Sequence, residues 1–276
     1  MICTMEPSYC KRFVRGVDFS GAQDAGTKIW IACGDISNDV ILISECFPAQ
    51  DLPESGRPRD PSMRALRAFI RKQGDSVFGL DFPFGIPHAL FEGETWEEWV
   101  DAFSDRYTSP EGFKRLCYLA SNGKELRRVT DVEAKTPFSP YNLRLYRQTY
   151  FGVRDILGPL IREEAVCVLP LQKPRDERPW VIEICPASTL KKENLRSPYK
   201  GSGRDRRAAR GKILRGMERT GVLKVEETSV RKRIIKDRGG HALDSVIAAY
   251  AIFKALSQGL ALETSPPYTI EGRVYV

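Results

Sequence analysis

The sequence predicts an α/β fold in which a mixed β-sheet is flanked by helices and interrupted by a helical insertion. Three observations lead to this prediction. Apolar runs near the N-terminus are separated by only a few turn residues, which is typical of antiparallel neighbours. Further apolar runs occur later, between segments of helical spacing, which favours parallel strands. Residues 241–257 form a strongly apolar segment, which indicates a helix packed on several sides.

Composition narrows the class of protein. The chain has 276 residues, of which 42% are hydrophobic, so it can build a proper core. No apolar run approaches the roughly 18–20 residues that span a bilayer, and the first twelve residues lack the apolar stretch of a secretory signal. Seven scattered cysteines form no C-x-x-C pair, so neither a zinc site nor a disulfide framework is indicated. We therefore expect a cytoplasmic protein without a membrane partner. The net charge of +7 points weakly to nucleic acid or another polyanion.

The first third of the chain supplies the antiparallel part of the predicted sheet and one helix. The strands expected there are 13–19, 28–34, 40–47 and 76–82. Apolar residues spaced by three and four predict a helix over 61–72, with Asp60 as N-cap and Pro61 in the first position. The fourth strand ends in D-F-P-F-G-I-P, where Pro83 and Pro87 prevent the sheet from continuing.

The middle of the chain, residues 88–160, is predicted to be a helical insertion. Its expected helices are 95–103, 110–120 and 143–157, and the polar, basic stretch 122–135 lies between the last two. We interpret its Trp and Phe residues as packing groups rather than as platforms for bases.

The remaining elements complete one predicted domain, residues 12–262, with tails at 1–11 and 263–276. The expected strands are 164–169, 180–185 and 222–225, and the expected helices are 187–193, 204–219, 227–236 and 241–257. The tail is expected to be irregular and to end in a short strand.

Four acidic residues lie in segments that otherwise look buried. Asp18, Asp81 and Glu183 each interrupt or end an apolar strand, and Asp244 lies in the first turn of the apolar helix. An unpaired buried charge is unfavourable, so such groups need a cation beside them. His241 precedes Asp244 by three residues and therefore lies on the same helix face.

A divalent metal would explain why four acids gather. Carboxylate oxygens favour Mg²⁺ or Mn²⁺ over zinc. Two such ions can hold the attacking water and the leaving oxygen of a phosphodiester. We therefore expect Asp18, Asp81, Glu183 and Asp244 to be metal ligands and catalytic residues, with His241 as a ligand, a proton shuttle or an aid in positioning water. The alternative stays open for each acid: Asp18 or Asp81 caps a turn, Glu183 pairs with an arginine, and Asp244 caps its helix.

Several motifs together resemble the predicted-nuclease family known as domain of unknown function 429, which is assigned a ribonuclease H-like fold. They are G-V-D-F-S-G-A (16–22), L-D-F-P-F-G-I-P (80–87), S-P-Y-N-L-R-L-Y-R-Q-T-Y (139–150), E-I-C-P-A-S-T-L (183–190) and G-G-H-A-L-D-S-V-I-A-A-Y (239–250). The resemblance spans about residues 13–256. It implies Asp18, Asp81, Glu183 and Asp244 as the acidic site, with His241 beside it. The pairing of His241 with Asp244 is also similar to the last helix of Holliday-junction resolvases of this fold.

Basic residues fit a nucleic-acid or nucleotide-containing substrate. Arg144 and Arg147 lie in the last predicted helix of the insertion, and Arg204 and Arg207 lie at the start of a basic helix. Arginines on such faces can hold phosphates, although a solvated basic face gives the same pattern.

The sequence therefore predicts a metal-dependent nuclease or phosphodiesterase. A second hypothesis is an ATP-dependent phosphotransferase of the actin and sugar-kinase superfamily, which shares the core. A third is a non-enzymatic nucleic-acid-binding module in which the acids are structural.

Overall fold

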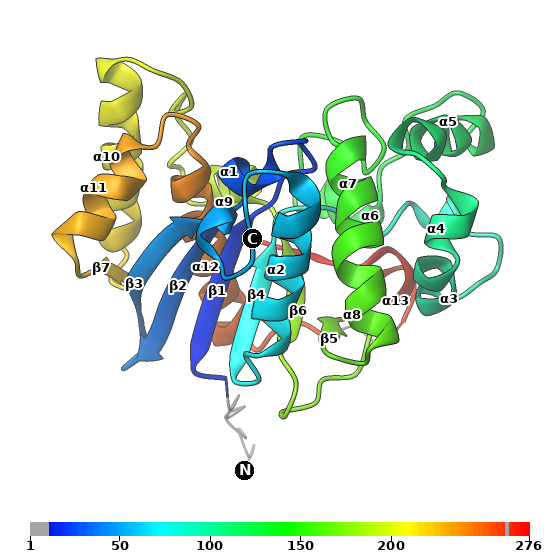
Figure 1. The fold of residues 1–276 in the computed structure, drawn as a ribbon, viewed down its shortest axis with the longest axis horizontal. Coiled ribbons are helices and arrows are strands. Elements are labelled where there is room, and N and C mark those ends of the chain that lie inside the picture. Colours follow the sequence, from blue (N-terminus) through cyan, green and yellow to red (C-terminus); the bar gives the residue numbers. More distant parts are fainter. Residues whose placement is uncertain (1–10, 263–264) are drawn as a thin grey trace, which may run out of the picture.

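A mixed β-sheet forms the centre of the molecule, in the computed structural model that describes residues 11–262 and 265–276 (Figure 1). Its strands lie in the order β5-β6-β4-β1-β2-β3-β7, and β8 pairs with β6. The strands are β1 (Phe13–Asp18), β2 (Trp30–Ser37), β3 (Val40–Pro48), β4 (Ser76–Leu80), β5 (Cys167–Leu169), β6 (Trp180–Ile184), β7 (Leu223–Val225) and β8 (Val274–Tyr275).

The pairing of the strands confirms the predicted mixed sheet. β1 runs antiparallel to β2, with Asp18 opposite Trp30, and β2 runs antiparallel to β3. β1 is parallel to β4, and β4 is parallel to β6. The carboxyl ends of β1, β4 and β6 therefore meet at one edge of the sheet, which is where α/β proteins build their sites.

Helix α12 (His241–Ser257) is the main support of the sheet, and it has the bounds that its apolar pattern predicts. It packs across β1, β2, β3 and β4, on the face of the sheet opposite to α2 (Figure 1). Its backbone comes so close to β1 that a Cβ on Gly16 would lie 2.0 Å from the carbonyl oxygen of Ser245 and 2.3 Å from the amide nitrogen of Ala249. Glycine at position 16 is thus what allows this helix to lie against the strand.

Helix α2 covers the other face of the sheet, and further helices gather at its two ends (Figure 1). The insertion contributes helices beyond β6, and α10 and α11 lie at the β7 end. The helical segments of the insertion are η2 (His88–Leu90), α3 (Trp96–Asp101), α4 (Phe103–Arg106), α5 (Pro110–Ala120), α6 (Val129–Glu133), α7 (Tyr146–Gly152), the π-helical η3 (Val153–Leu157) and α8 (Gly158–Arg162). The remaining ones are α1 (Ala25–Lys28), η1 (Ala49–Asp51), α2 (Arg59–Arg71), α9 (Pro186–Lys192), α10 (Arg204–Glu218), α11 (Thr228–Lys236) and α13 (Tyr268–Glu271).

Aromatic side chains of the insertion pack its interior, as their interpretation as packing groups requires. Trp96 and Trp99 are fully buried, and the Trp99 ring meets Phe103 edge-on with 5.1 Å between ring centroids. They belong to the same apolar core as Val17 of β1 and Phe78 of β4, so the insertion is continuous with one face of the sheet.

Some boundaries differ from the sequence prediction. α2 begins at Arg59 after Pro58, so Asp60 lies inside the first turn instead of capping it. α7 begins at Tyr146, which leaves Arg144 in the preceding turn, and the basic stretch 122–135 contains α6. In the tail predicted at 263–276, residues 268–271 form α13 where an irregular chain was expected, whereas the expected short final strand is present as β8 and pairs with β6. Of the tail predicted at residues 1–11, all but Lys11 lies outside the described residues. Within 11–262 and 265–276, no helix has both the length and the apolarity that a membrane crossing requires.

Replacing Gly16 with alanine tests the close approach of α12. We expect Gly16→Ala to lower the free energy of unfolding by about 1–3 kcal/mol or more, because the added Cβ overlaps helix backbone that cannot move aside cheaply. Denaturant unfolding followed by circular dichroism measures this change.

Gly211→Ala in α10 is the matched control. Its Cβ would lie 3.3 Å from the mobile end of Arg215 and 3.8 Å, an ordinary contact distance, from the side chain of Ile235. In a helix, alanine is favoured over glycine by about 1 kcal/mol. Equal unfolding midpoints for Gly16→Ala and wild type would contradict the packing described above.

Candidate functional site

Three aspartates converge at the carboxyl edge of the sheet. Asp18 is the last residue of β1, and Asp81 directly follows β4, where its amide donates to the carbonyl of Val17 at 3.1 Å. Asp244 lies in the first turn of α12, which crosses β1 and β4. The parallel pairing of β1 with β4 and the seating of α12 thus bring together three acids that are far apart in sequence.

Asp18 is paired with His241. Its Oδ2 lies 2.7 Å from Nδ1 of His241, and Asp18 is only 5% exposed. Burial by itself would lower the pKa of His241, but the hydrogen bond and the negative charge of Asp18 outweigh burial and raise it. The imidazole is therefore biased toward its protonated form by the first of the three aspartates.

Asp244 is held by two neighbours from the turn before α10. The hydroxyl of Tyr199 donates to Oδ1, and the ammonium of Lys200 lies 2.7 Å from Oδ2. Burial raises the pKa of Asp244 to about 6; Lys200 opposes this shift, whereas the nearby charge of Asp18 adds to it.

Asp81 differs from the other two acids because its carboxylate has no hydrogen bond or ion pair within the described part of the chain. Burial, followed by the negative charges of Asp18 and Asp244, raises its pKa well above the usual value. Lys200 acts in the opposite direction, and the charges of all three aspartates also raise the pKa of Lys200 against the effect of its burial. The Lys200 ammonium is thus the cation that partly balances this group.

Glu183, the fourth predicted acid, lies in a separate network. Its two oxygens accept from Nη1 and Nη2 of Arg128, at 2.7 and 2.5 Å, and Oε2 also accepts from the amide of Phe84 at 2.9 Å. Arg128 is fully buried and also binds both oxygens of Asp131. Burial raises the pKa of Glu183, and Arg128 counteracts the shift. Glu183 therefore ties β6 to the insertion, which is the alternative that the sequence left open for it.

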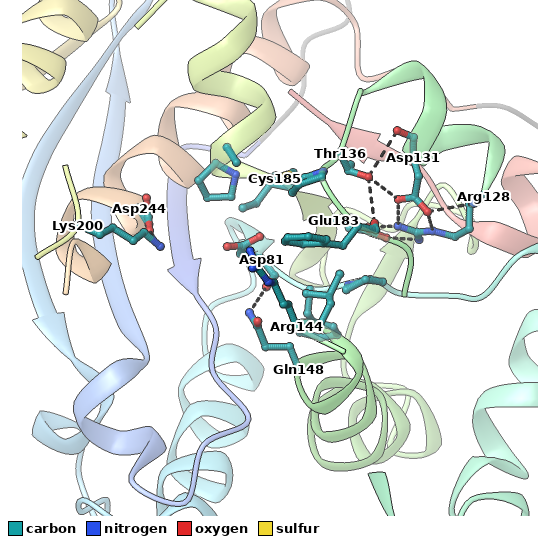
Figure 2. A pocket seen from close by; sticks show the side chains of 18 of the residues that line it. Asp81, Arg128, Asp131, Thr136, Arg144, Gln148, Glu183, Cys185, Lys200 and Asp244 are labelled. Atoms are coloured by element: carbon teal, nitrogen blue, oxygen red, sulfur yellow. Dashed lines mark hydrogen bonds and ion pairs between the residues drawn. The ribbon is translucent and has the colours of Figure 1, made fainter. Parts of the chain in front are cut away.

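A cavity of about 250 Å³ is lined both by the aspartates Asp81 and Asp244 and by the network of Arg128, Glu183 and Asp131. Asp81 lies between the Asp244–Lys200 pair on one side and the Arg128–Glu183–Asp131 network on the other (Figure 2). Arg144 and Gln148 of the insertion also line the cavity, and Gln148 donates to the backbone oxygens of Phe19 and Asp81. The cavity at the carboxyl edge of the sheet is thus lined both by acids of the core and by residues of the insertion.

The four arginines predicted to bind nucleic acid lie in different places. Arg144 lines the cavity with its guanidinium 5.5 Å from the centre of the Phe138 ring. Arg147 forms an exposed ion pair with Glu111. Arg204 and Arg207 are exposed at the start of α10 and line no part of this cavity. Only Arg144 is brought to the predicted acids, and its role in binding stays a prediction.

Sequence reasoning missed Tyr199, Lys200 and Arg128 as partners of the acids. Tyr199 and Lys200 precede a Gly-Ser-Gly turn, and no local pattern there marks contact with a helix that begins at residue 241. Arg128 stood out only as one more basic residue of the insertion. Their roles depend on contacts between residues 45 and 55 positions apart, which only the folded chain reveals.

The carboxylates do not form a ready-made metal site. Within residues 11–262 and 265–276, no three His, Cys, Asp or Glu side chains make up a group that could hold a metal ion. Both oxygens of Asp244 are already bound, by Tyr199 and Lys200. Comparison with known proteins adds no assignment, because no family model, curated protein or solved structure matches this chain.

Arg128→Met tests the structural role of the Arg128–Glu183–Asp131 network. Removing the guanidinium leaves two buried carboxylates without their cation, so we expect the free energy of unfolding to fall by about 3–5 kcal/mol. Urea unfolding measures the change.

Arg147→Met removes an arginine from an exposed pair and should change stability by less than about 1 kcal/mol. If the two variants were equally stable, the network would not support the fold.

Proposed function

We propose that this protein is a divalent-metal-dependent phosphodiester hydrolase of ribonuclease H-like fold that acts on nucleic acid. The arrangement of the core supports the fold assignment: three antiparallel strands, then β4 and β6 parallel to β1, and a helix that brings the last acid to the sheet edge. The resemblance of the sequence motifs to a predicted-nuclease family supports the activity.

The unpartnered carboxylate of Asp81 is the observation that carries the proposal. It lies beside two further aspartates, and burial together with their negative charges raises its pKa well above normal. A protein rarely keeps three acids together unless a cation binds there. Asp18, Asp81 and Asp244 are the proposed ligands.

The chemistry of these donors fits Mg²⁺ or Mn²⁺, which prefer carboxylate oxygens. Lys200 would first have to release Asp244. Its ammonium is partly buried against the acids, but its side chain is 58% exposed, so it can move away from Asp244 without opening the apolar core. A second ion stays a prediction, because Glu183, the fourth expected ligand, is held by Arg128.

The residues of the site have separable roles in such a reaction. A bound divalent cation would lower the pKa of water and stabilise negative charge that develops on the phosphate. His241, held by Asp18, is placed to hold or donate a proton at the edge of the acid cluster. Lys200, once released, offers a positive charge to the phosphate, and the walls of the cavity limit the access of bulk water.

Asp81→Asn tests the proposed ligand set through stability as well as activity. Without metal, we expect this variant to melt about 2–4 °C above wild type, because it removes a repulsive charge worth about 1 kcal/mol. With Mn²⁺ added, wild type should gain stability and the variant should not. Scanning fluorimetry against Mn²⁺ concentration measures both effects, and Mn²⁺-dependent cleavage of labelled oligonucleotides should be lost.

Lys200→Met is the informative companion variant. It removes the cation that competes for Asp244, so its stabilisation by Mn²⁺ should exceed that of wild type. Equal Mn²⁺ stabilisation of wild type and Asp81→Asn would show that these acids do not bind the metal.

A further inference from the structure

A second hollow, the basic groove, adjoins the acidic cavity. Its cationic lining residues are Arg127, Lys135, Lys191 and Arg196, and its volume is about 400 Å³. Among residues 11–262 and 265–276, no Asp or Glu lines it. The groove and the cavity share Thr136, Pro137 and Ala187 in their walls, so the two hollows lie side by side.

Two separate segments build the groove. Arg127 and Lys135 flank α6 of the insertion. Lys191 lies in the last turn of α9, and Arg196 follows in the next loop. Because α9 begins directly after β6, this side of the groove is fixed to the strand whose carboxyl end borders the acids. The insertion and the core thus face each other across it.

The charges in the groove are not balanced by neighbouring acids. All four side chains are exposed, and none has an ion pair in the described part of the chain. The single side-chain hydrogen bond among them joins Arg127 to the neutral hydroxyl of Thr136 at 3.4 Å. By contrast, the exposed Arg71 and Arg147 are paired with Glu163 and Glu111. Four uncompensated cations around one hollow favour a polyanionic ligand.

We propose that the basic groove binds the phosphate backbone of a single strand of nucleic acid and directs it into the acidic cavity. The second part of this proposal, that the nucleic acid continues into the acidic cavity, rests on the function proposed above. The cavity, at about 250 Å³, has room for one nucleotide unit and is too small for a duplex. The guanidinium of Arg144, which lies over the Phe138 ring in the wall of the cavity, offers a flat surface on which an unpaired base can stack.

The test measures binding without metal. Fluorescence anisotropy of a labelled single-stranded oligothymidylate of about 12 nucleotides is followed in EDTA at several salt concentrations. Lys135→Gln/Lys191→Gln should raise Kd about 20-fold at about 0.1 M salt and lower the slope of log K against log salt by about 1.4, since each phosphate contact to a single strand contributes about 0.7.

Lys232→Gln/Lys236→Gln is the matched control. It removes the same net charge from exposed lysines of α11, which line a different hollow. Its Kd should stay within about twofold of wild type. Equal weakening of binding by both double variants would overturn the proposed role of the groove, since only the net charge of the protein would then matter. Tighter binding of a duplex of the same length, or no binding by wild type, would also overturn it.

The binding test is independent of the proposed chemistry. If Mn²⁺ fails to bind but the groove variants behave as expected, the hydrolase proposal fails and the proposal that the groove binds nucleic acid is upheld. If Mn²⁺-dependent cleavage occurs and the two double variants bind alike, only the groove is overturned.

Discussion

The close approach of α12 to β1 is the constraint on which the site depends. Gly16 lets the helix backbone lie against the strand, and this contact fixes where the first turn of the helix falls. His241 then reaches Asp18, and Asp244 faces the same hollow as Asp81. A larger residue at position 16 would push the helix outward and separate the acids by the same displacement. The core packing and the geometry of the site are therefore set by one contact.

Two acidic groups at the same sheet edge are stabilised in different ways. Glu183 and Asp131 share a buried arginine, and the acceptors in that network are satisfied by fixed donors. Such a network holds the insertion and β6 together. Among the described residues Asp81 has no such donor, and Asp244 depends on Tyr199 and on a lysine whose side chain is 58% exposed. The fully paired group of Glu183, Asp131 and Arg128 thus lies across the cavity from Asp81 and Asp244, whose negative charge Lys200 balances only in part. The first group has a structural role, and the second has the proposed chemical role.

The sequence predicted most of the fold because local patterns determine it. The short turns between the first strands, the prolines after Asp81 and the apolar run 241–257 each specify an element without reference to the rest of the chain. The boundary errors arose where capping was decided by tertiary contacts, as at the start of α2, or where a short helix lies in a segment predicted to be irregular, as for α13.

The candidate site was predictable only in part. An acid in an apolar segment marks a residue that needs a cation, and this signal identified Asp18, Asp81, Glu183 and Asp244. It does not say which cation is supplied. Glu183 pairs with Arg128 of the insertion, and Asp244 pairs with Lys200 of a turn. Both are long-range contacts that residue spacing in the sequence does not predict. For the same reason, Arg144 reached the cavity while Arg204 and Arg207 did not.

The most direct measurement is a crystal structure of the full chain soaked in Mn²⁺, with data collected for anomalous scattering. The account predicts an anomalous peak bordered by Asp18, Asp81 and Asp244, with the Lys200 ammonium moved away from Asp244. An ammonium still seated on Asp244, with no peak among the three carboxylates at saturating Mn²⁺, would contradict it.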